Sequence, residues 1–534
     1  MARRNVGRHG RRVQKITPRR WLPFLALLAV IAGAVVISRQ NDQPDPVRDR
    51  APAAATRLPV ASQADALSTA WYCAGGSGLG PDGPSELSVV IANAEDHGVT
   101  SDISIVGANG KQATTTVEVP ANGRTRVVGS EFVKATWIAM SVEVLGGRAT
   151  VEREVQGPLG FDVSPCSSNA ATTWFVPSGS TVRGARLDLV LYNPFPDATS
   201  VDIVFATDQG TRSPRSLKGF AIPGRSVRVV PQQDLPARRP EIATKITART
   251  GRLVVDRVQT YDGTGDSVKG TGATPVATPA PKGLASTAAI PTVGPRWIFP
   301  DARVSDGVRT QVAIYNPSSR EARIDVAVDH QNPARYPEVE PVQITVPPRS
   351  EQIVDLTQVQ AITPDVPFSI DVRSLDEVPV VAEQLSFSAP PVAAAAAGGA
   401  AAKETAPPAV VQGFAVVPGA PVAATTWFFA SRGGSLARNA SVVVANPGAG
   451  TAHLTVTQLS AGKRSVVTGA SVSIPAGDRR ELDLSKADVG SAIIIESDGA
   501  VVASHTLVGL HGRGLAEALG TPFPETVVDL LPPR

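Results

Sequence analysis

Apolar and polar residues alternate in short runs along the chain, and several of these runs end at an asparagine. Leu87, Val89 and Ile91 precede Asn93 in this way, and a similar alternation precedes Asn193. A period of two indicates a β-strand with one buried face. Glycine, proline and asparagine separate the runs, and few segments have the 3.6-residue period of a helix. The pattern therefore predicts an all-β protein with antiparallel sheets.

Four stretches of the chain repeat the same markers in the same order. Each opens with a tryptophan, reaches an asparagine nineteen to twenty-two residues later, and passes a Val-Pro or Ile-Pro turn before a final valine-rich run. Markers that recur four times in one order indicate internal repetition. The opening residues are Trp71, Trp174, Trp297 and Trp427, and the strand-end residues are Asn93, Asn193, Asn316 and Asn446.

The markers predict four tandem immunoglobulin-like antiparallel β-sandwiches. We expect each tryptophan to fill the core of its own module, and each asparagine to bond local backbone where a strand ends. A β-propeller is the alternative fold. It fits less well, because successive tryptophans are 103, 123 and 130 residues apart, whereas a blade takes about 40 to 50 residues.

The N-terminus combines a basic segment with an apolar one. Residues 1–20 hold eight Lys or Arg and no acid, and residues 21–38 are uncharged and mostly apolar. An 18-residue helix spans about 27 Å, close to the thickness of a membrane core. The cations should remain cytoplasmic, which places the remaining chain outside. We expect a single-pass anchor at the cell membrane; a cleaved secretion signal, and hence a secreted protein, is the alternative.

Composition between the repeated stretches supplies the expected domain boundaries. Pro-, Ala- and Gly-rich segments are typical of stalks and linkers, and Leu515–Leu519 is expected to form a short helix in the tail. The expected parts are a basic segment 1–20, a membrane helix 21–38, a stalk 39–69, module 1 at 70–167, module 2 at 171–262, a linker 263–294, module 3 at 295–388, a linker 389–423, module 4 at 424–510 and a tail 511–534.

The charge balance excludes a nucleic-acid partner. The whole chain has 51 basic and 48 acidic residues, but without residues 1–20 it has 43 basic and 48 acidic, a net charge of −5. No basic stripe interleaved with aromatics remains. Cys73 and Cys166 are an even pair in an oxidising compartment, and we expect them to form a disulfide that joins the two ends of module 1. Two buried free thiols are the alternative.

Residues with catalytic or ligand-binding chemistry form no motif. The histidines lack metal-ligand spacing, and the Gly75–Gly80 loop fits neither phosphate-binding pattern. Glu152 and Glu154 are expected on one solvated strand face, and Arg479, beside a proline turn, is expected to face solvent. We therefore predict no catalytic residue, no cofactor and no metal, and a protein that is not an enzyme.

The motifs together resemble a known family. The Trp-aromatic opening, the "NP" strand end, the "[VI]PAG" turn, and the elements "WYC", "GFDVSPC" and "TTWF" are similar to those of exported, single-anchor envelope proteins of unknown function from high-GC Gram-positive bacteria. The resemblance implies an extracytoplasmic location and no particular activity. We expect a scaffold, binding or adhesion protein that contacts the membrane through residues 21–38 and meets cell-wall polymers or envelope proteins. The alternatives are a factor or enzyme that processes glycan or peptidoglycan, and a purely structural stalk.

Overall fold

The computed structural model describes residues 56–80, 83–233, 235–266, 280–389 and 411–530. The chain divides into two compact units, Met1–Asp49 and Arg50–Arg534. The first unit, with the expected membrane helix at 21–38, lies outside the described residues. Inside the described ranges, no helix has both the length and the apolar character that a membrane span requires. These ranges form antiparallel β-sheets and short 3-10 helices, so the protein is all-β, as the period of two predicts.

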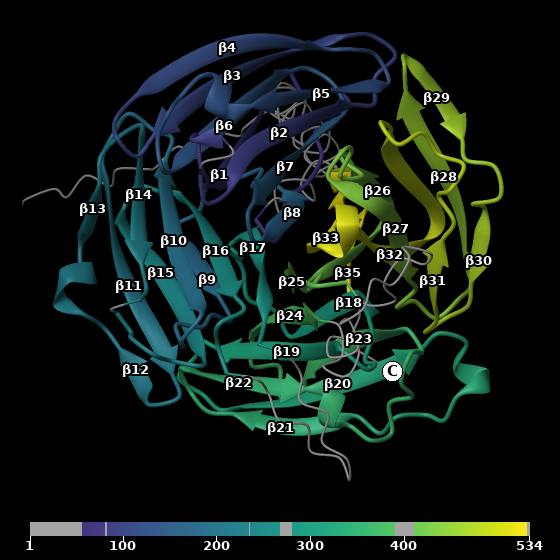
Figure 1. The fold of residues 1–534 in the computed structure, drawn as a ribbon. Helices are drawn as coiled ribbons and strands as arrows, with labels where there is room; N and C mark the ends of the chain where they lie inside the picture. The colour runs from purple at the N-terminus through teal and green to yellow at the C-terminus, as the bar shows by residue number, and fades with distance from the viewer. Residues whose placement is uncertain (1–55, 81–82, 234, 267–279, 390–410, 531–534) are drawn as a thin grey trace, which may run out of the picture. The chain divides into compact units, whose positions relative to one another are not determined.

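The strands form four successive sets, which we call repeats 1 to 4 (Figure 1). The first strand of each set contains one of the four repeated tryptophans. Repeat 1 contains two four-stranded sheets with the orders β1-β6-β3-β4 and β5-β2-β7-β8. Its strands are β1 Thr69–Gly76, β2 Glu86–Asn93, β3 Val99–Gly107, β4 Gln112–Val119, β5 Gly123–Val128, β6 Ile138–Leu145, β7 Ala149–Gly157 and β8 Gly160–Pro165.

Repeats 2 and 3 have the same plan, with sheet orders such as β14-β10-β16-β17 and β22-β19-β24-β25. Repeat 2 contains β9 Thr173–Val176, β10 Ala185–Asn193, β11 Thr199–Thr207, β12 Gly210–Arg212, β13 Phe220–Ile222, β14 Ser226–Pro231, β15 Ile242–Thr250, β16 Val254–Asp262 and β17 Lys282–Ala288. Repeat 3 contains β18 Arg296–Ala302, β19 Val308–Asn316, β20 Ala322–His330, β21 Val342–Val346, β22 Ser350–Asp355, β23 Phe368–Ser374, β24 Val381–Ser388 and β25 Gly413–Pro418.

Repeat 4 differs because one long strand, β32, takes part in both of its sheets. Its strands are β26 Val422–Phe429, β27 Ala437–Ala445, β28 Ala452–Ser460, β29 Lys463–Val466, β30 Val472–Ile474, β31 Arg479–Leu482, β32 Ala492–Gly509, β33 Leu515–Leu519, β34 Thr521–Pro522 and β35 Val527–Asp529. The 3-10 helices of the described residues are η3 Gly129–Glu131, η4 Arg215–Leu217, η5 Pro333–Arg335, η6 Leu356–Gln358, η7 Leu510–Gly512 and η8 Pro524–Thr526.

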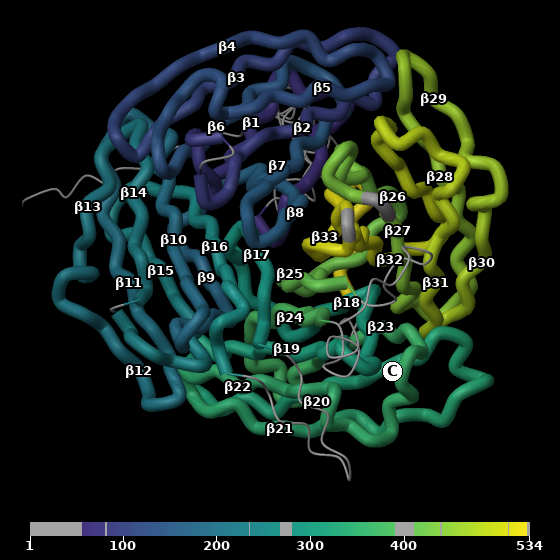
Figure 2. Tube along the Cα trace, viewed as in Figure 1, coloured from purple at the N-terminus to yellow at the C-terminus, as the bar shows by residue number. Residues whose placement is uncertain are grey.

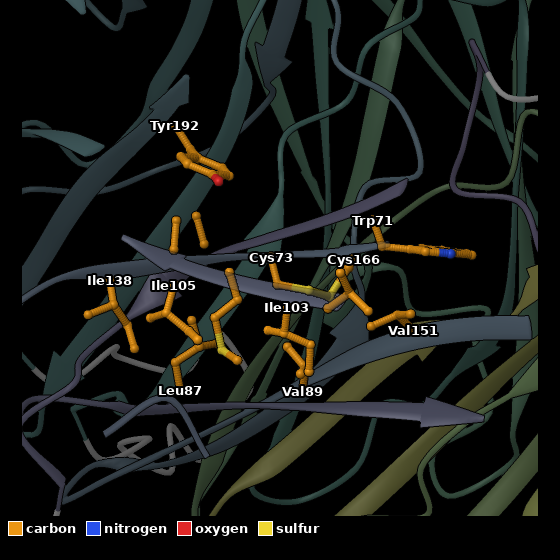
Figure 3. Close-up of a cluster of buried hydrophobic side chains, with 14 of the residues drawn as sticks. Trp71, Cys73, Leu87, Val89, Ile103, Ile105, Ile138, Val151, Cys166 and Tyr192 are labelled. Carbon is orange, nitrogen blue, oxygen red and sulfur yellow. A yellow bond between two sulfur atoms is a disulfide. The ribbon is translucent and has the colours of Figure 1, made fainter. Parts of the chain in front are cut away.

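The strands that end at an asparagine are buried on both faces, not on one as the alternation predicts. In β2, Leu87, Val89 and Ile91 enter the core of repeat 1, shown in Figure 3. The alternate residues Val90 and Ala92 pack into a second apolar cluster with residues of repeat 4. Contact between repeats therefore covers the face that an isolated sandwich would leave in water.

Three segments expected as linkers or tail contain strands. β17, β25 and β33 each pair with the last long strand of their own repeat, as β8 does in repeat 1. The residues expected to form a short helix at Leu515–Leu519 are strand β33. These strands are short and rich in small residues, such as LASTA in β17, so their composition resembled that of a linker.

The four strands β8, β17, β25 and β33 contact one another in a closed cycle: β8 meets β17 and β33, and β25 also meets β17 and β33 (Figure 2). At or next to the start of each strand, a glycine is followed by Phe or Leu: Gly160-Phe161, Gly283-Leu284, Gly413-Phe414 and Gly514-Leu515. A Cβ built on Gly283 would lie 2.5 Å from the Cβ and backbone nitrogen of Phe414, and one built on Gly413 would lie 2.6 Å from those atoms of Leu515. Only glycine lets these backbones approach so closely.

Part of the expected stalk is packed against the repeats. The side chains of Leu58 and Val60 belong to the core cluster of repeat 4. The N–H of Ala61 donates to the carbonyl oxygen of Pro522 at 2.9 Å. The N–H of Ser62 donates to the carbonyl oxygen of Ala149 at 2.9 Å. Residues 58–62 therefore connect the first and last repeats instead of extending freely.

Candidate functional site

Each tryptophan lies in the core of its own repeat, and the exposed fraction of its side chain is at most 1%. In repeats 2 to 4 the indole N–H donates to a backbone oxygen of Leu253, Val380 or Val501. Each acceptor stands at the beginning of the valine-rich run that ends the repeat. We call this run the closing strand: β7, β16, β24 and the second half of β32. Indoles buried in this way have no face available for a ligand. Their recurrence reflects packing of the two sheets.

Each asparagine holds together the turn that follows its strand. The amide nitrogen of Asn316 donates to the carbonyl oxygens of Arg320 at 2.7 Å, Val346 at 3.0 Å and Pro347 at 3.2 Å. Its oxygen accepts from the backbone N–H of Ser318 at 3.0 Å. Asn93, Asn193 and Asn446 make the same set of bonds. The side chain thereby satisfies backbone groups that neither strand can pair.

Cys73 and Cys166 form a disulfide in the core of repeat 1, and both residues are fully buried (Figure 3). The bridge joins β1 to the residue that follows β8, across 93 positions of sequence. It therefore connects the first strand of the repeat with its last.

The closing strand of repeats 1 to 3 contains an acid followed by Arg or Gln, and these side chains meet at the junctions between repeats. Arg153 of repeat 1 pairs with Asp256 of repeat 2 at 2.9 Å, and neither side chain is exposed. Arg257 of repeat 2 pairs with Glu383 of repeat 3 at 2.6 Å. The base of one repeat thus neutralises the acid of the next, which is the condition under which buried charges are tolerated.

The other two junctions lack a charged pair at these positions. At the third junction, between repeats 3 and 4, Gln384 occupies the position of the base and Ser504 occupies the position of the acid. Neither charge is therefore present there. At the fourth junction, burial lowers the pKa of His505 to about 4 and raises the pKa of Glu152 to about 8. Both groups are therefore neutral near pH 6, and each of the four junctions is balanced in charge at these two positions.

The structure corrects two predictions of solvent exposure, one for Glu152 and Glu154 and one for Arg479. Glu152 and Glu154 are buried, not solvated, and they accept hydrogen bonds from the backbone N–H and the hydroxyl of Ser431 at 2.8 and 2.6 Å. Arg479 is 1% exposed and pairs with Asp301 at 2.8 Å. In each case the strand face that would be solvated in a separate sandwich packs against a neighbouring repeat.

An open groove of about 510 Å³ lies between repeat 1 and repeat 2. Its floor is the outer face of the β1-β6-β3-β4 sheet, where Tyr72, Ser141 and Ser104 lie side by side on adjacent strands. Tyr192 and Phe195, at the end of β10 and just beyond it, line the opposite side. The groove therefore combines small hydroxyl side chains with aromatic rings.

In each of the other repeats the position of Ser141, in the middle of the floor, is occupied by a larger or charged side chain. The residues equivalent to the three floor residues are Phe175, Lys245 and Val204 in repeat 2, Ile298, Asp371 and Ala327 in repeat 3, and Phe428, Ile494 and Thr457 in repeat 4. At the junction of repeats 3 and 4 the remaining cavity is about 90 Å³. At the junction of repeats 4 and 1, Phe428 and Ile494 pack into an apolar cluster with Ala92. The short serines of repeat 1 leave its groove open.

One group among the described residues has metal-ligand types close together. Ligand atoms of Glu95, Asp96 and His97 lie within 4.8 Å of one another. The group sits in the turn after β2, where Asp96 and His97 are exposed. Exposed acidic groups of this kind are common without an ion, so the cluster by itself does not support a metal site.

Sequence reasoning did not identify the groove or the junction pairs. The alignment of the closing strands contained a signal for the pairs, because Glu152, Asp256 and Glu383 occupy the same register, each opposite the residue three before the repeat's asparagine. The groove had no comparable signal. Tyr72 and Tyr192 are 120 positions apart, and only the fold brings them together.

The chain belongs to a family of unknown function, DUF5719, whose sequence profile matches residues 81–288 and 258–514. No match to the chain was found among curated proteins. The matches span most of the repeats but assign no chemistry to them.

Three solved structures match the chain at low TM-scores. The protein 1070 of Thermotoga maritima is 18% identical, with 23% of this chain and 91% of that chain covered and a TM-score of 0.17. The Anabaena sensory rhodopsin transducer is 22% identical, with 16% and 76% covered and a TM-score of 0.15. A tetra-tandem repeat from the extending region of a large adhesion protein is 12% identical, with 82% and 94% covered and a TM-score of 0.11. We draw no functional argument from these similarities.

Proposed function

We propose that the protein is a membrane-anchored, extracytoplasmic binding scaffold built of four immunoglobulin-like β-sandwiches. It meets cell-wall polymers or envelope proteins and performs no catalysis. The basic residues 1–20 and the apolar residues 21–38 support anchorage with the repeats outside. The junction contacts support a scaffold, because they couple successive repeats into one body that can hold a binding surface in a defined geometry.

The disulfide between Cys73 and Cys166 is the observation that carries this proposal. Disulfides persist in extracellular and envelope proteins, whereas cytosolic thiols are kept reduced. The bridge is buried in the core of repeat 1 and involves both cysteines of the chain. A role in catalytic or redox-sensing thiol exchange would require access that this position does not provide.

The location is tested on the full chain in cells. Membrane fractionation and protease added to intact, wall-stripped cells should find the chain in the membrane fraction and its repeats open to digestion. Thiol labelling without reductant should leave Cys73 and Cys166 unmodified, and labelling after unfolding with reductant should modify both. Reduced thiols in a protease-protected chain would contradict the proposal.

N-terminal sequencing of the same material distinguishes the anchor from its alternative. An intact N-terminus in the membrane fraction supports a single-pass anchor, and a released chain that begins near residue 33 or beyond supports secretion after cleavage. Incubation of the purified full chain with cell-wall polymers then separates the remaining functions. Retention without products supports a binding scaffold, release of fragments an enzyme, and no retention a structural stalk.

A further inference from the structure

The groove between repeats 1 and 2 has the two surface chemistries that proteins use to hold a sugar. Sugar hydroxyls require hydrogen-bond acceptors and donors, and the C–H faces of the ring pack on aromatic side chains. The volume of about 510 Å³ lies within the range of about 300 to 1,000 Å³ typical of small-ligand sites. The groove is open to solvent, so a ligand can enter it.

Two carboxylates lie beside the hydroxyl floor. Asp102 on β3 and Glu143 on β6 are direct cross-strand neighbours, and both are exposed in the groove. Like charges in this arrangement destabilise a sheet. Asp102 accepts from the hydroxyl of Thr116 at 2.6 Å, whereas Glu143 has no hydrogen-bond or ion-pair partner among the described residues. Its oxygens remain available to accept from a ligand hydroxyl.

The aromatic side of the groove is held in place by its own contacts. The ring of Tyr72 lies 6.4 Å from that of Tyr192, and 6.5 Å from that of Phe195. The hydroxyl of Tyr192 bonds to that of Ser141 at 2.5 Å. The guanidinium of Arg252 lies 4.5 Å from the centroid of Phe195. These rings are positioned before any ligand arrives, which lowers the entropy cost of binding.

The groove disfavours two other ligand classes. The lining holds two carboxylates, Asp102 and Glu143, and one guanidinium, Arg225, so its net charge is negative and it would repel the phosphates or carboxylates of an anionic polymer. An extended peptide that adds to a sheet needs a free strand edge, but the floor strands β3 and β6 are paired on both sides. At one end, the amide of Gln112 donates to the carbonyl oxygen of Arg225 at 3.2 Å and links repeat 1 to repeat 2.

We propose that this groove binds a neutral saccharide segment of a glycan. Sugar rings pack on the half-buried rings of Tyr72 and Phe195, and sugar hydroxyls donate to the carboxylates of Asp102 and Glu143. The inference rests on the proposed function, since it names the ligand class of the binding scaffold. It concerns one junction of the four, because the serines of repeat 1 leave this junction open.

The test measures binding of defined oligosaccharides to the purified full chain in detergent. The probes are neutral tetrasaccharides of N-acetylglucosamine, mannose and arabinose, with dextran sulfate and a lysine-rich peptide as charged comparisons. We expect at least one neutral tetrasaccharide to bind, as followed by calorimetry. Removal of a hydrogen bond to a charged group lowers affinity by about tenfold or more, so Glu143→Gln should have an effect of that size, and Tyr72→Ala should weaken binding in the same direction.

Two matched variants lie outside the groove. Glu118→Gln changes an exposed acid on β4 of the same sheet, and Tyr336→Ala changes a half-buried tyrosine of repeat 3. Both should bind as the unmodified chain does, and an unchanged unfolding midpoint checks that each variant folds. Failure of all three tetrasaccharides to bind, preference for either charged probe, or binding unaffected by Tyr72→Ala and Glu143→Gln would overturn the inference. If protease reaches the repeats in cells but the chain binds no sugar, only the saccharide site is refuted. If the chain is found in the cytosol, the proposed function is refuted.

Discussion

At the residue scale, the same side chain meets the same backbone requirement four times. A strand that ends next to a proline turn leaves carbonyl oxygens and an N–H without partners, and an asparagine amide has the donors and the acceptor to satisfy them. Asn193 donates to the oxygens of Asp197, Ile222 and Pro223, which lie in two different segments. Aspartate lacks the donor and serine lacks the reach, which explains the repeated choice of asparagine.

Replacement of one of these asparagines should destabilise the fold. Asn316→Ala leaves buried carbonyl oxygens of β21 and its turn without a donor, and we expect a loss of about 2 to 4 kcal/mol in the free energy of unfolding. Asn109→Ala is the control, because Asn109 bonds the carbonyl oxygen of Lys134 in an exposed turn. Chemical denaturation monitored by tryptophan fluorescence provides both values. Equal losses of unfolding free energy in the two variants would show that the buried hydrogen bonds of Asn316 stabilise the fold no more than the exposed bond of Asn109.

Burial of Glu152 and His505 makes stability depend on pH in opposite directions. The pKa of Glu152 is raised from 4.5 to about 8, so the stability linked to this group is full below about pH 4.5 and is lost as pH rises to about 8. The pKa of His505 is lowered from 6.5 to about 4, so its contribution is lost as pH falls from about 6.5 to about 4. Glu517, with a pKa of about 8, adds to the loss at high pH.

Two substitutions separate these effects in a pH series of unfolding curves. Relative to the unmodified chain, Glu152→Gln should gain stability as pH rises from about 5 to 8. His505→Gln should gain stability as pH falls from about 6.5 to 4. Each gain is at most about 1.4 kcal/mol per pH unit. Variants that remain parallel to the unmodified chain across the series would show that these groups are hydrated in the folded state.

At the element scale, the inner strands depend on glycine. β8, β17 and β25 each have a glycine in close contact with a neighbouring strand or the residue beside it, and so does Gly514, just before β33, whose neighbour is Phe161 of repeat 1. This contact between β33 of the last repeat and β8 of the first completes the cycle of strand contacts. Composition alone predicted linkers or tail for three of the four, because small residues and nearby prolines are typical of both linkers and closely packed backbone.

A methyl group at one of these glycines should disrupt the contact. Gly283→Ala places a Cβ 2.5 Å from the backbone nitrogen of Phe414, a separation that requires the backbone to move. We expect a loss of about 1 to 3 kcal/mol in unfolding free energy, as for other overpacked sites. Gly450→Ala is the control, since no atom lies within 4 Å of its Cβ position. A neutral effect of Gly283→Ala would mean that β17 and β25 are not in close contact.

At the scale of the whole molecule, contacts between repeats replace the independence that tandem modules usually have. The ion pair between Arg257 and Glu383, together with the contacts of β17 with β8 and β25, couples neighbouring repeats. Removing one partner of a buried ion pair leaves an unpaired charge in the protein interior, which is destabilising. Replacing both partners with apolar residues leaves no buried charge. The third junction, with Gln384 and Ser504, follows the same rule, because both the base and the acid are absent.

A double-mutant cycle at the second junction tests this coupling. Arg257→Met or Glu383→Met alone should cost about 3 to 5 kcal/mol of unfolding free energy, and the double variant should recover most of that loss. The exposed pair of Arg464 and Glu496 is the control and should show little coupling. Unfolding of the unmodified chain should be a single cooperative transition. Additive losses, or separate transitions for the repeats, would contradict the coupling.

The sequence alone determined the features that arise from local physics. Period-two alternation, Asn-Pro strand ends and the spacing of Trp71, Trp174, Trp297 and Trp427 are set by neighbours along the chain, and they were sufficient for the all-β class and the repeated plan. Only the tertiary structure decided which sheet faces are covered, because burial depends on segments that lie hundreds of positions apart. It therefore decided that Glu152 is buried against repeat 4, that β17 and β25 are strands, and that the groove beside Tyr72 stays open.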